Sequence, residues 1–208
     1  MNALGALEND RTAAIKSPRD VLRFGLEAGE QSLRETVEDI TEEEYCWEPL
    51  SASEQAADRL IPPQRKRVWR VFEHEELWTY DYTPEVVKPS PYTTIAWIMC
   101  HIAQTADMYL YCVLTGKPEG VERHWEDLPV HSGLEAMSRY LFEVLSMVRQ
   151  YLVSIPETSV LGELNKLTPA PWGEMRPTYR NIWGGVIEHI LQHSMQIAAR
   201  KDSIRYGY

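Results

Sequence analysis

Two histidines four residues apart are the first candidates for chemistry in this 208-residue chain. His189 and His193 lie in GGVIEHILQHSMQIAAR, residues 184–200, where apolar residues recur with helical spacing. Because an α-helix turns once in about 3.6 residues, these two side chains project from one face, roughly 6 Å apart along the axis. Two imidazoles placed in this way can chelate one metal ion.

The zinc-protease motif is excluded at this pair. That motif needs a glutamate directly after its first histidine, to act as the general base, and this chain has Ile190 there. Glu188 precedes the pair and is turned about 100° from His189 around the helix, so we expect it to face solvent. The pair alone leaves two interpretations open, a metal site or a helix that carries two polar residues.

A third histidine favours the metal site. His101 lies in TTIAWIMCHIAQTADMY on the stripe of Ile98 and Ile102, which predicts that it faces the protein interior. A buried imidazole needs a partner, and helical bundles commonly build metal sites from inward side chains on facing helices. The alternative is that His101 hydrogen-bonds a backbone carbonyl or a tyrosine, while the pair lies at a wet groove.

The remaining histidines and the cysteines are weaker candidates. His74 lies among acids in FEHEELW, and His124 and His131 flank WEDLPV, so surface or loop positions are expected. No two cysteines have the C-x-x-C spacing. The sequence therefore predicts neither a disulfide framework nor a thiolate zinc site. No Ser-His-Asp arrangement or phosphate-binding glycine loop is visible. We expect buried free thiols at all three cysteines, Cys46, Cys100 and Cys112.

Four long helices are predicted to position these residues. The first begins at Ser17, where a cap residue is followed by proline and then an acid at the third position. The others are expected over about 93–116, 132–154 and 177–200. The apolar stripes that should form the core are Val21, Phe24, Gly25, Ala28 and Val37, then Ile95, Ile98, Ile102, Tyr109 and Val113, then Leu134, Met137, Leu141, Val144, Leu145, Val148 and Leu152, and finally Tyr179, Ile182, Trp183, Val186, Ile190 and Ile197.

Residues 51–89 interrupt this pattern with Pro62-Pro63, a basic RKR triplet and an aromatic-rich stretch. One or two short helices are expected there, with the triplet on a solvated face. Before them, Thr41 and Glu44 predict a short capped turn. With no sheet signal, the fold class is predicted to be all-α. The architecture expected over 1–208 is a single four-helix-bundle domain with an inserted helical or loop segment at about 51–89.

Charge and hydropathy limit the partners. The formal net charge is -10, with 21 Lys and Arg against 31 Asp and Glu, and no basic run lies beside an aromatic cluster, so nucleic acid is not an expected partner. The amino terminus lacks the apolar core of a signal peptide, and no 18-residue apolar run follows. We therefore expect a cytoplasmic protein that does not engage a membrane.

With three histidines in place, the chain resembles the DinB/YfiT-like superfamily of metal-binding four-helix bundles. The resemblance is carried by PSPYTTIAWIMCHIAQTADMY, WEDLPV and WGGVIEHILQHSMQIAAR. That family places a histidine in its second long helix and H-x-x-x-H followed by QI in its fourth. These positions are His101, His189, His193, Gln196 and Ile197. ITEEEYCWEP is similar to the segment after the family's first helix, whereas 51–89 has no counterpart.

The resemblance implies a divalent metal, zinc, nickel or iron, held by His101, His189 and His193 with room for water or substrate. It implies a metal-dependent transferase or isomerase that acts with a low-molecular-weight thiol such as mycothiol or bacillithiol, and a homodimer. The alternative is a non-catalytic metal-binding or small-molecule-binding protein, such as one with a role in stress responses. Helix geometry places four further residues where they would line the pocket, or simply pack between helices: Thr105, Met108, Gly185 and Gln196.

Overall fold

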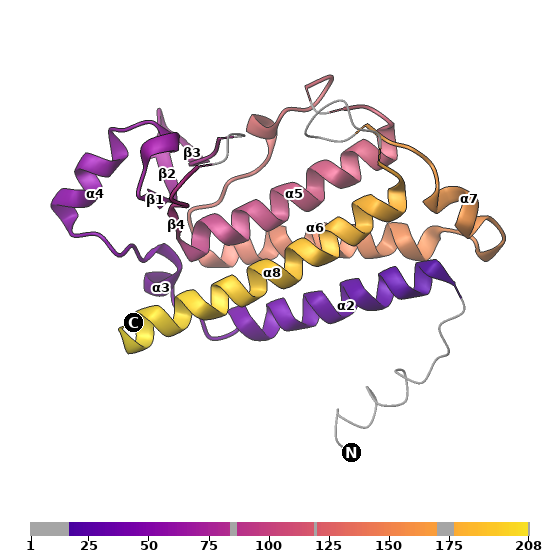
Figure 1. The fold of residues 1–208 in the computed structure, drawn as a ribbon, viewed down its shortest axis with the longest axis horizontal. Coiled ribbons are helices and arrows are strands. Elements are labelled where there is room, and N and C mark those ends of the chain that lie inside the picture. Colours follow the sequence, from indigo (N-terminus) through magenta and orange to yellow (C-terminus); the bar gives the residue numbers. More distant parts are fainter. Residues whose placement is uncertain (1–16, 84–86, 119, 170–176, 208) are drawn as a thin grey trace, which may run out of the picture.

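Four long helices lie side by side in the computed structural model, which describes residues 17–83, 87–118, 120–169 and 177–207 (Figure 1). Residues 1–16, on which the expected lack of a signal peptide depends, fall outside this part. α2 packs against α6 and α8, and α5 packs against the same two helices, so the four enclose one apolar core. Their bounds are Pro18–Val37 for α2, Ile95–Thr115 for α5, Leu134–Ser154 for α6 and Tyr179–Tyr206 for α8.

The helix ends follow the capping signals in the sequence. Ser17 and Asp20 form a capping box at the start of α2. The Thr94 hydroxyl caps α5 by accepting a hydrogen bond from Trp97 N at 3.1 Å. Gly116 ends α5 in the left-handed conformation, with φ 67°, which glycine adopts without a Cβ clash. The four predicted helices are confirmed, and α8 continues beyond the expected end near residue 200.

The predicted core is right on three long helices and mostly wrong on the first. On α2, Val21 is 52% exposed and Phe24 is 51% exposed, Ala28 is also exposed, and Gly25 is only partly buried. The buried stripe is instead Leu22, Leu26 and Leu33, spaced by four and seven residues, so the helix is rotated relative to the expectation. Val37 is buried as predicted. The stripes on the other helices are buried, except that Tyr109 and Leu134 are only partly covered.

The expectation of no sheet is wrong between residues 68 and 93. Two small sheets form there, β1 (Val68–Trp69) parallel to β4 (Tyr92–Thr93), and β2 (Val71–His74) antiparallel to β3 (Leu77–Tyr80). The β2–β3 turn is Glu75-Glu76, with φ of 49° and 65°. Two-residue hairpin turns of this kind usually carry Asn or Gly, so Glu-Glu gave no turn signal.

The short helices expected in 51–89 are confirmed as α4 (Ala52–Arg59) and the 3₁₀ turn η1 (Pro63–Arg65). They follow α3 (Glu42–Cys46), whose capping box at Thr41 is also confirmed. The RKR triplet is not wholly solvated. Lys66 is 7% exposed and its Nζ lies 2.5 Å from Asp81 Oδ1, since a buried ammonium needs a counter-charge.

Short helical turns lie in the connections between the long helices. Between α5 and α6, the 3₁₀ turn η2 (Trp125–Asp127) is held near the helices because the Arg123 guanidinium donates to both Asp107 oxygens, at 3.0 and 2.8 Å. The turn η3 (Glu157–Ser159) and α7 (Val160–Leu164) follow α6. In the ranges that the structure describes, every helix is too short or too polar to cross a bilayer.

Two of the three free cysteines are buried as expected. Cys100 and Cys112 are 0% exposed on α5. Cys46 is exposed, so the expectation is wrong there. Cys46 is the last residue of the five-residue helix α3. This helix buries Glu44 and Tyr45, and Cys46, which follows them, is exposed to solvent.

Candidate metal centre

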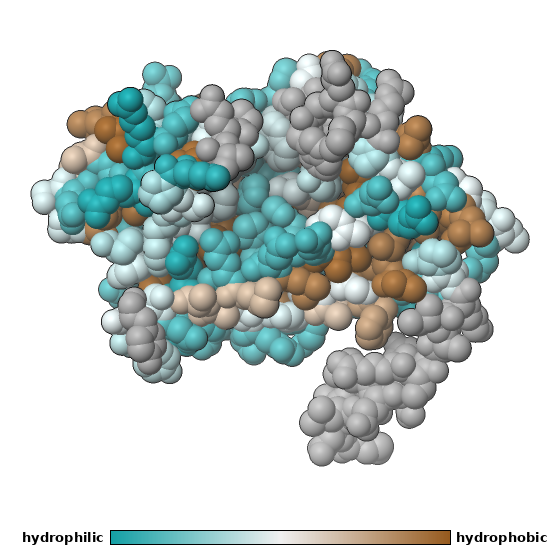
Figure 2. Space-filling model, in the orientation of Figure 1, coloured by the Kyte–Doolittle hydropathy of each residue, from teal (hydrophilic) through white to brown (hydrophobic). Residues whose placement is uncertain are grey.

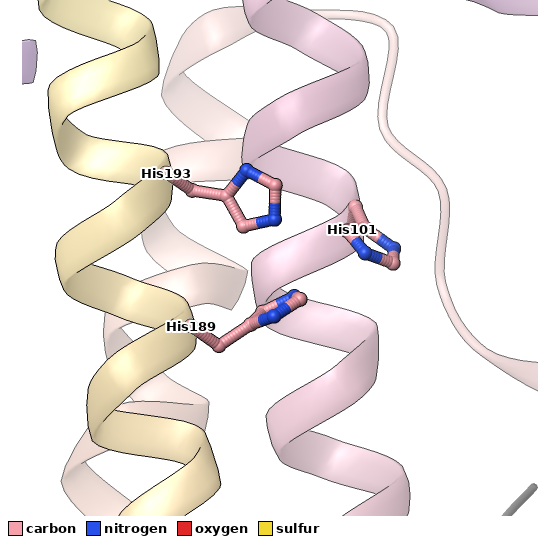
Figure 3. Close-up of side chains that lie close together, drawn as sticks. All are labelled: His101, His189 and His193. Carbon is pink, nitrogen blue, oxygen red and sulfur yellow. The ribbon is translucent and has the colours of Figure 1, made fainter. Parts of the chain in front are cut away.

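α5 and α8 bring the three predicted histidines together. His101 comes from α5 and His189 and His193 from α8, and their rings turn toward one another where the helices pack (Figure 3). Ring centroids lie 4.8 Å apart for His101 and His189, 5.3 Å for His101 and His193, and 4.4 Å for the α8 pair. One nitrogen from each ring lies within 4.8 Å of the other two.

This cluster fits a divalent metal ion. Imidazole nitrogens bind zinc at about 2.0–2.1 Å, so two on one ion are separated by roughly 3–4 Å, which small ring rotations would reach. His189 Nε2 is buried and has no hydrogen-bond partner among the described residues. A buried nitrogen in this state is costly, and a metal would satisfy it. Zinc, nickel, copper and iron all accept such a donor set, so the cluster does not select among them.

A hydrogen-bond chain fixes the orientation of His193. Its Nδ1 lies 2.8 Å from Gln196 Oε1, and Gln196 Nε2 donates to Thr93 Oγ1 at 2.8 Å. With the amide oxygen toward the ring, Nδ1 carries the proton and Nε2 keeps its lone pair for a metal. Gln196 was expected at the site. Thr93 was not, because no local pattern links residues 103 positions apart.

Trp97 packs against the His101 ring. The two rings are stacked, with centroids 4.7 Å apart and 25° between their planes. Trp97 Nε1 donates to the Asp81 carbonyl at 2.5 Å, and the Trp69 ring lies 5.3 Å away, so the inserted segment holds this tryptophan in place. Trp97 was not among the expected site residues, although its position one helical turn before His101 was a usable signal.

Burial keeps the three imidazoles neutral. Burial, and then the neighbouring His193, lower the pKa of His189 to about 3. Burial and then the two α8 histidines hold the pKa of His101 well below its usual value. Burial also lowers the pKa of His193, opposed by the hydrogen bond to Gln196. The neutral ring is the form that binds metal, so the site is ready for a metal at neutral pH.

Thr105, Met108 and Gly185, the other residues predicted to line the pocket, lie in three different environments. Thr105 is 5% exposed on α5. Met108 is fully buried in a separate apolar cluster with Cys112 and Leu128. A Cβ added at Gly185 would meet no atom within 4 Å, so there is open space beside that glycine. Of the four, only Gln196 has a described contact with a histidine of the cluster.

The remaining polar candidates lie apart from the cluster. Glu188 is exposed, as expected, and accepts a hydrogen bond from Gln192. The His74 side chain is 69% exposed on β2. His124 precedes η2, and His131 lies in the following loop, where its carbonyl accepts from Tyr45 Oη at 3.0 Å. None of these three histidines is a member of the described cluster.

Comparison with known families identifies the class of protein. The family model described as the DinB superfamily matches residues 26–197. Because this match covers most of the chain, the chain belongs to the DinB superfamily. The matched range contains α5 and most of α8, and with them all three histidines. No curated protein and no solved structure matches the chain.

Proposed function

We propose that this protein binds one divalent metal ion through His101, His189 and His193 and acts as a transferase or isomerase on a low-molecular-weight thiol. The observation that carries the proposal is the charge of the site. Burial lowers the pKa of all three imidazoles and so favours their neutral form, and none of their described ring contacts and hydrogen bonds is with a carboxylate. Neutral ligands do not offset the positive charge of a divalent ion. The full charge of a bound ion would therefore be available to attract an anion.

A bound divalent ion supplies a positive charge that lowers the pKa of a thiol and stabilises its thiolate near neutral pH. The protein residues supply position and a dry environment. Gln196 holds the His193 ring with its Nε2 free, and Trp97 covers one face of His101. Three protein ligands, rather than the four of closed structural sites, leave room for an exogenous ligand.

We also propose that the four long helices form the bundle of the superfamily and that two copies associate. The four helices share one core, which supports the first statement. Exposed apolar side chains on α2 and α8 support the second. Zinc, nickel and iron are all candidate metals for the site.

A non-catalytic metal-binding or small-molecule-binding protein is the second candidate. The same lack of carboxylate contacts favours it, since the described neighbours of the histidines offer no general acid or base. Trp97 and Gln196 orient the rings, but neither can accept a proton from a substrate near neutral pH.

Thiol conjugation distinguishes the two candidates. Metal-loaded protein should accelerate the reaction of mycothiol, bacillithiol or glutathione with an electrophile such as monochlorobimane. His193→Ala, at unchanged helicity, should lose this acceleration. If none of the thiols reacts faster than in buffer containing the same metal, the binding-protein candidate is correct.

A further inference from the structure

A second site lies in the inserted segment. α3, α4 and the β2–β3 hairpin lie at one end of the molecule (Figure 1). Residues of these elements line a pocket of about 690 Å³. None of the three clustered histidines lines it. Its wall includes polar side chains from α4 and the strands, the exposed thiol of Cys46, and apolar groups from Val71, Phe72, Trp78 and Ala96.

Two buried side chains in this wall keep hydrogen-bonding capacity. Arg70 is 2% exposed; its Nη2 donates to Asp58 Oδ2 at 2.8 Å, and its Nε lies 3.0 Å from Glu48 Oε1. Arg70 Nη1 and Glu48 Oε2 are both buried and have no hydrogen-bond partner among the described residues, and Arg70 Nε, although ion-paired with Glu48 Oε1, makes no hydrogen bond either. Because the Arg70 and Glu48 side chains are in contact, the unpaired donor Nη1 and the unpaired acceptor Oε2 belong to neighbouring groups. Buried polar groups are normally paired, so these two atoms mark a binding position.

The charge around the pair disfavours an anionic ligand. Arg70 already lies between two carboxylates, Glu48 and Asp58. The pocket is lined by three cations, Arg59, Lys66 and Arg70, and two acids, Glu48 and Glu73. Two further carboxylates, Asp81 and Asp58, pair with Lys66 and Arg70 and offset their charges. A ligand carboxylate would lie beside the Glu48 carboxylate, and like charges at this distance repel.

We propose that this pocket binds a small molecule that carries a carboxamide group. Its carbonyl oxygen accepts from Arg70 Nη1, and its N–H donates to Glu48 Oε2. A planar or apolar body attached to the amide packs against Trp78, which shares one face of the β2–β3 hairpin with Glu73. This site is independent of the metal centre and of its proposed reaction.

Benzamide is a suitable probe, with benzoate as its charged counterpart. Protein freed of metal by chelation, at pH 8, is titrated with each compound while the reaction of Cys46 with a chromogenic disulfide is followed. Cys46 lines the pocket, and the other two cysteines are buried, so the reaction reports on this site. Benzamide should protect Cys46 saturably. Benzoate should bind roughly tenfold more weakly, because it leaves Glu48 without a donor.

Variants test the residues. The Trp78 side chain is 43% exposed, so Trp78→Ala should fold and should weaken benzamide binding several-fold through lost ring contact. Tyr206→Ala, at a 69% exposed position outside the pocket, is the matched control and should bind as the wild type does. Arg70→Lys, checked by circular dichroism, should abolish the preference for benzamide over benzoate.

Three results would overturn the proposal. They are the absence of saturable protection by millimolar benzamide, binding of benzoate at least as tight as that of benzamide, and equal affinity in wild type and Trp78→Ala. None of these depends on whether the three histidines bind a metal, since the protein is metal-free throughout.

Discussion

Gln196 Oε1 lies 2.8 Å from His193 Nδ1, and the same amide donates to Thr93 at the junction of β4 and α5. This contact joins the two helices that provide the histidines. It also fixes which nitrogen of His193 is available, so it would couple helix packing to metal binding at the proposed site.

Loss of this hydrogen bond should weaken metal binding without removing a ligand. Gln196→Ala is expected to lower metal affinity by roughly 10–100-fold, as is usual for residues that orient a ligating histidine. Gln196→Glu keeps an oxygen acceptor and should retain most of the affinity. The measurement is competition with a chromogenic chelator. Gln192→Ala, at an exposed position on the same helix, should have no effect.

Trp97 should contribute to stability through two separable interactions. Trp97→Phe keeps a ring beside His101 but loses the hydrogen bond to the Asp81 carbonyl, which should cost about 1 kcal/mol. Trp97→Ala also loses the buried ring and should cost about 3–5 kcal/mol. Urea unfolding gives both values. Trp78→Phe, at a partly exposed position, is the control, and a Trp97→Phe variant as stable as the wild type would contradict the role of that hydrogen bond.

Metal binding should persist at mildly acidic pH. Protons compete with a metal only when the pH falls toward the pKa of the ligand in the folded protein. Ordinary histidines begin to compete near pH 6.5, whereas burial lowers the pKa of His189 to about 3 and also lowers the pKa of the other two rings. Affinity should therefore fall less between pH 7.5 and 6 than it would at a site of exposed histidines. A loss of bound metal with a midpoint near pH 6.5 would show that the rings are protonated as in solvent.

Self-association should use the α2–α8 side of the molecule. Figure 2 shows apolar side chains along the face where these helices lie together. Phe24 on α2 and Leu191 and Met195 on α8 are 51%, 41% and 68% exposed. Light scattering should give a dimer, and Met195→Glu should shift it toward monomer. Leu161→Glu on α7 is the control at a similarly exposed position, and a monomeric wild type at high concentration would refute this prediction.

The long helices and the three histidines could be predicted because their signals are local. Capping residues mark Ser17 and Thr94, and four-residue spacing places His189 and His193 on one face. Which side of α2 is buried could not be predicted from the sequence with the same success. Val21 and Phe24 are as apolar as the leucines beside them, and only contact with α6 and α8 decides which stripe is buried.

The inserted segment shows where local signals fail. Its hairpin turns at two glutamates, and its buried charges depend on partners distant in sequence, such as Lys66 with Asp81 and Arg70 with Glu48. The contact of Asp81 with Trp97 is likewise long-range, so the link between this segment and the histidine cluster could be seen only in the structure.

Metal content per chain tests the central proposal most directly. Wild type, His189→Ala and His74→Ala are loaded with zinc, nickel or iron, washed by gel filtration and measured by elemental analysis. We expect roughly one ion per chain in wild type and in His74→Ala, and almost none in His189→Ala at equal helicity. Wild-type protein that retains no ion at micromolar metal, or equal loss in both variants, would contradict a site built from His101, His189 and His193.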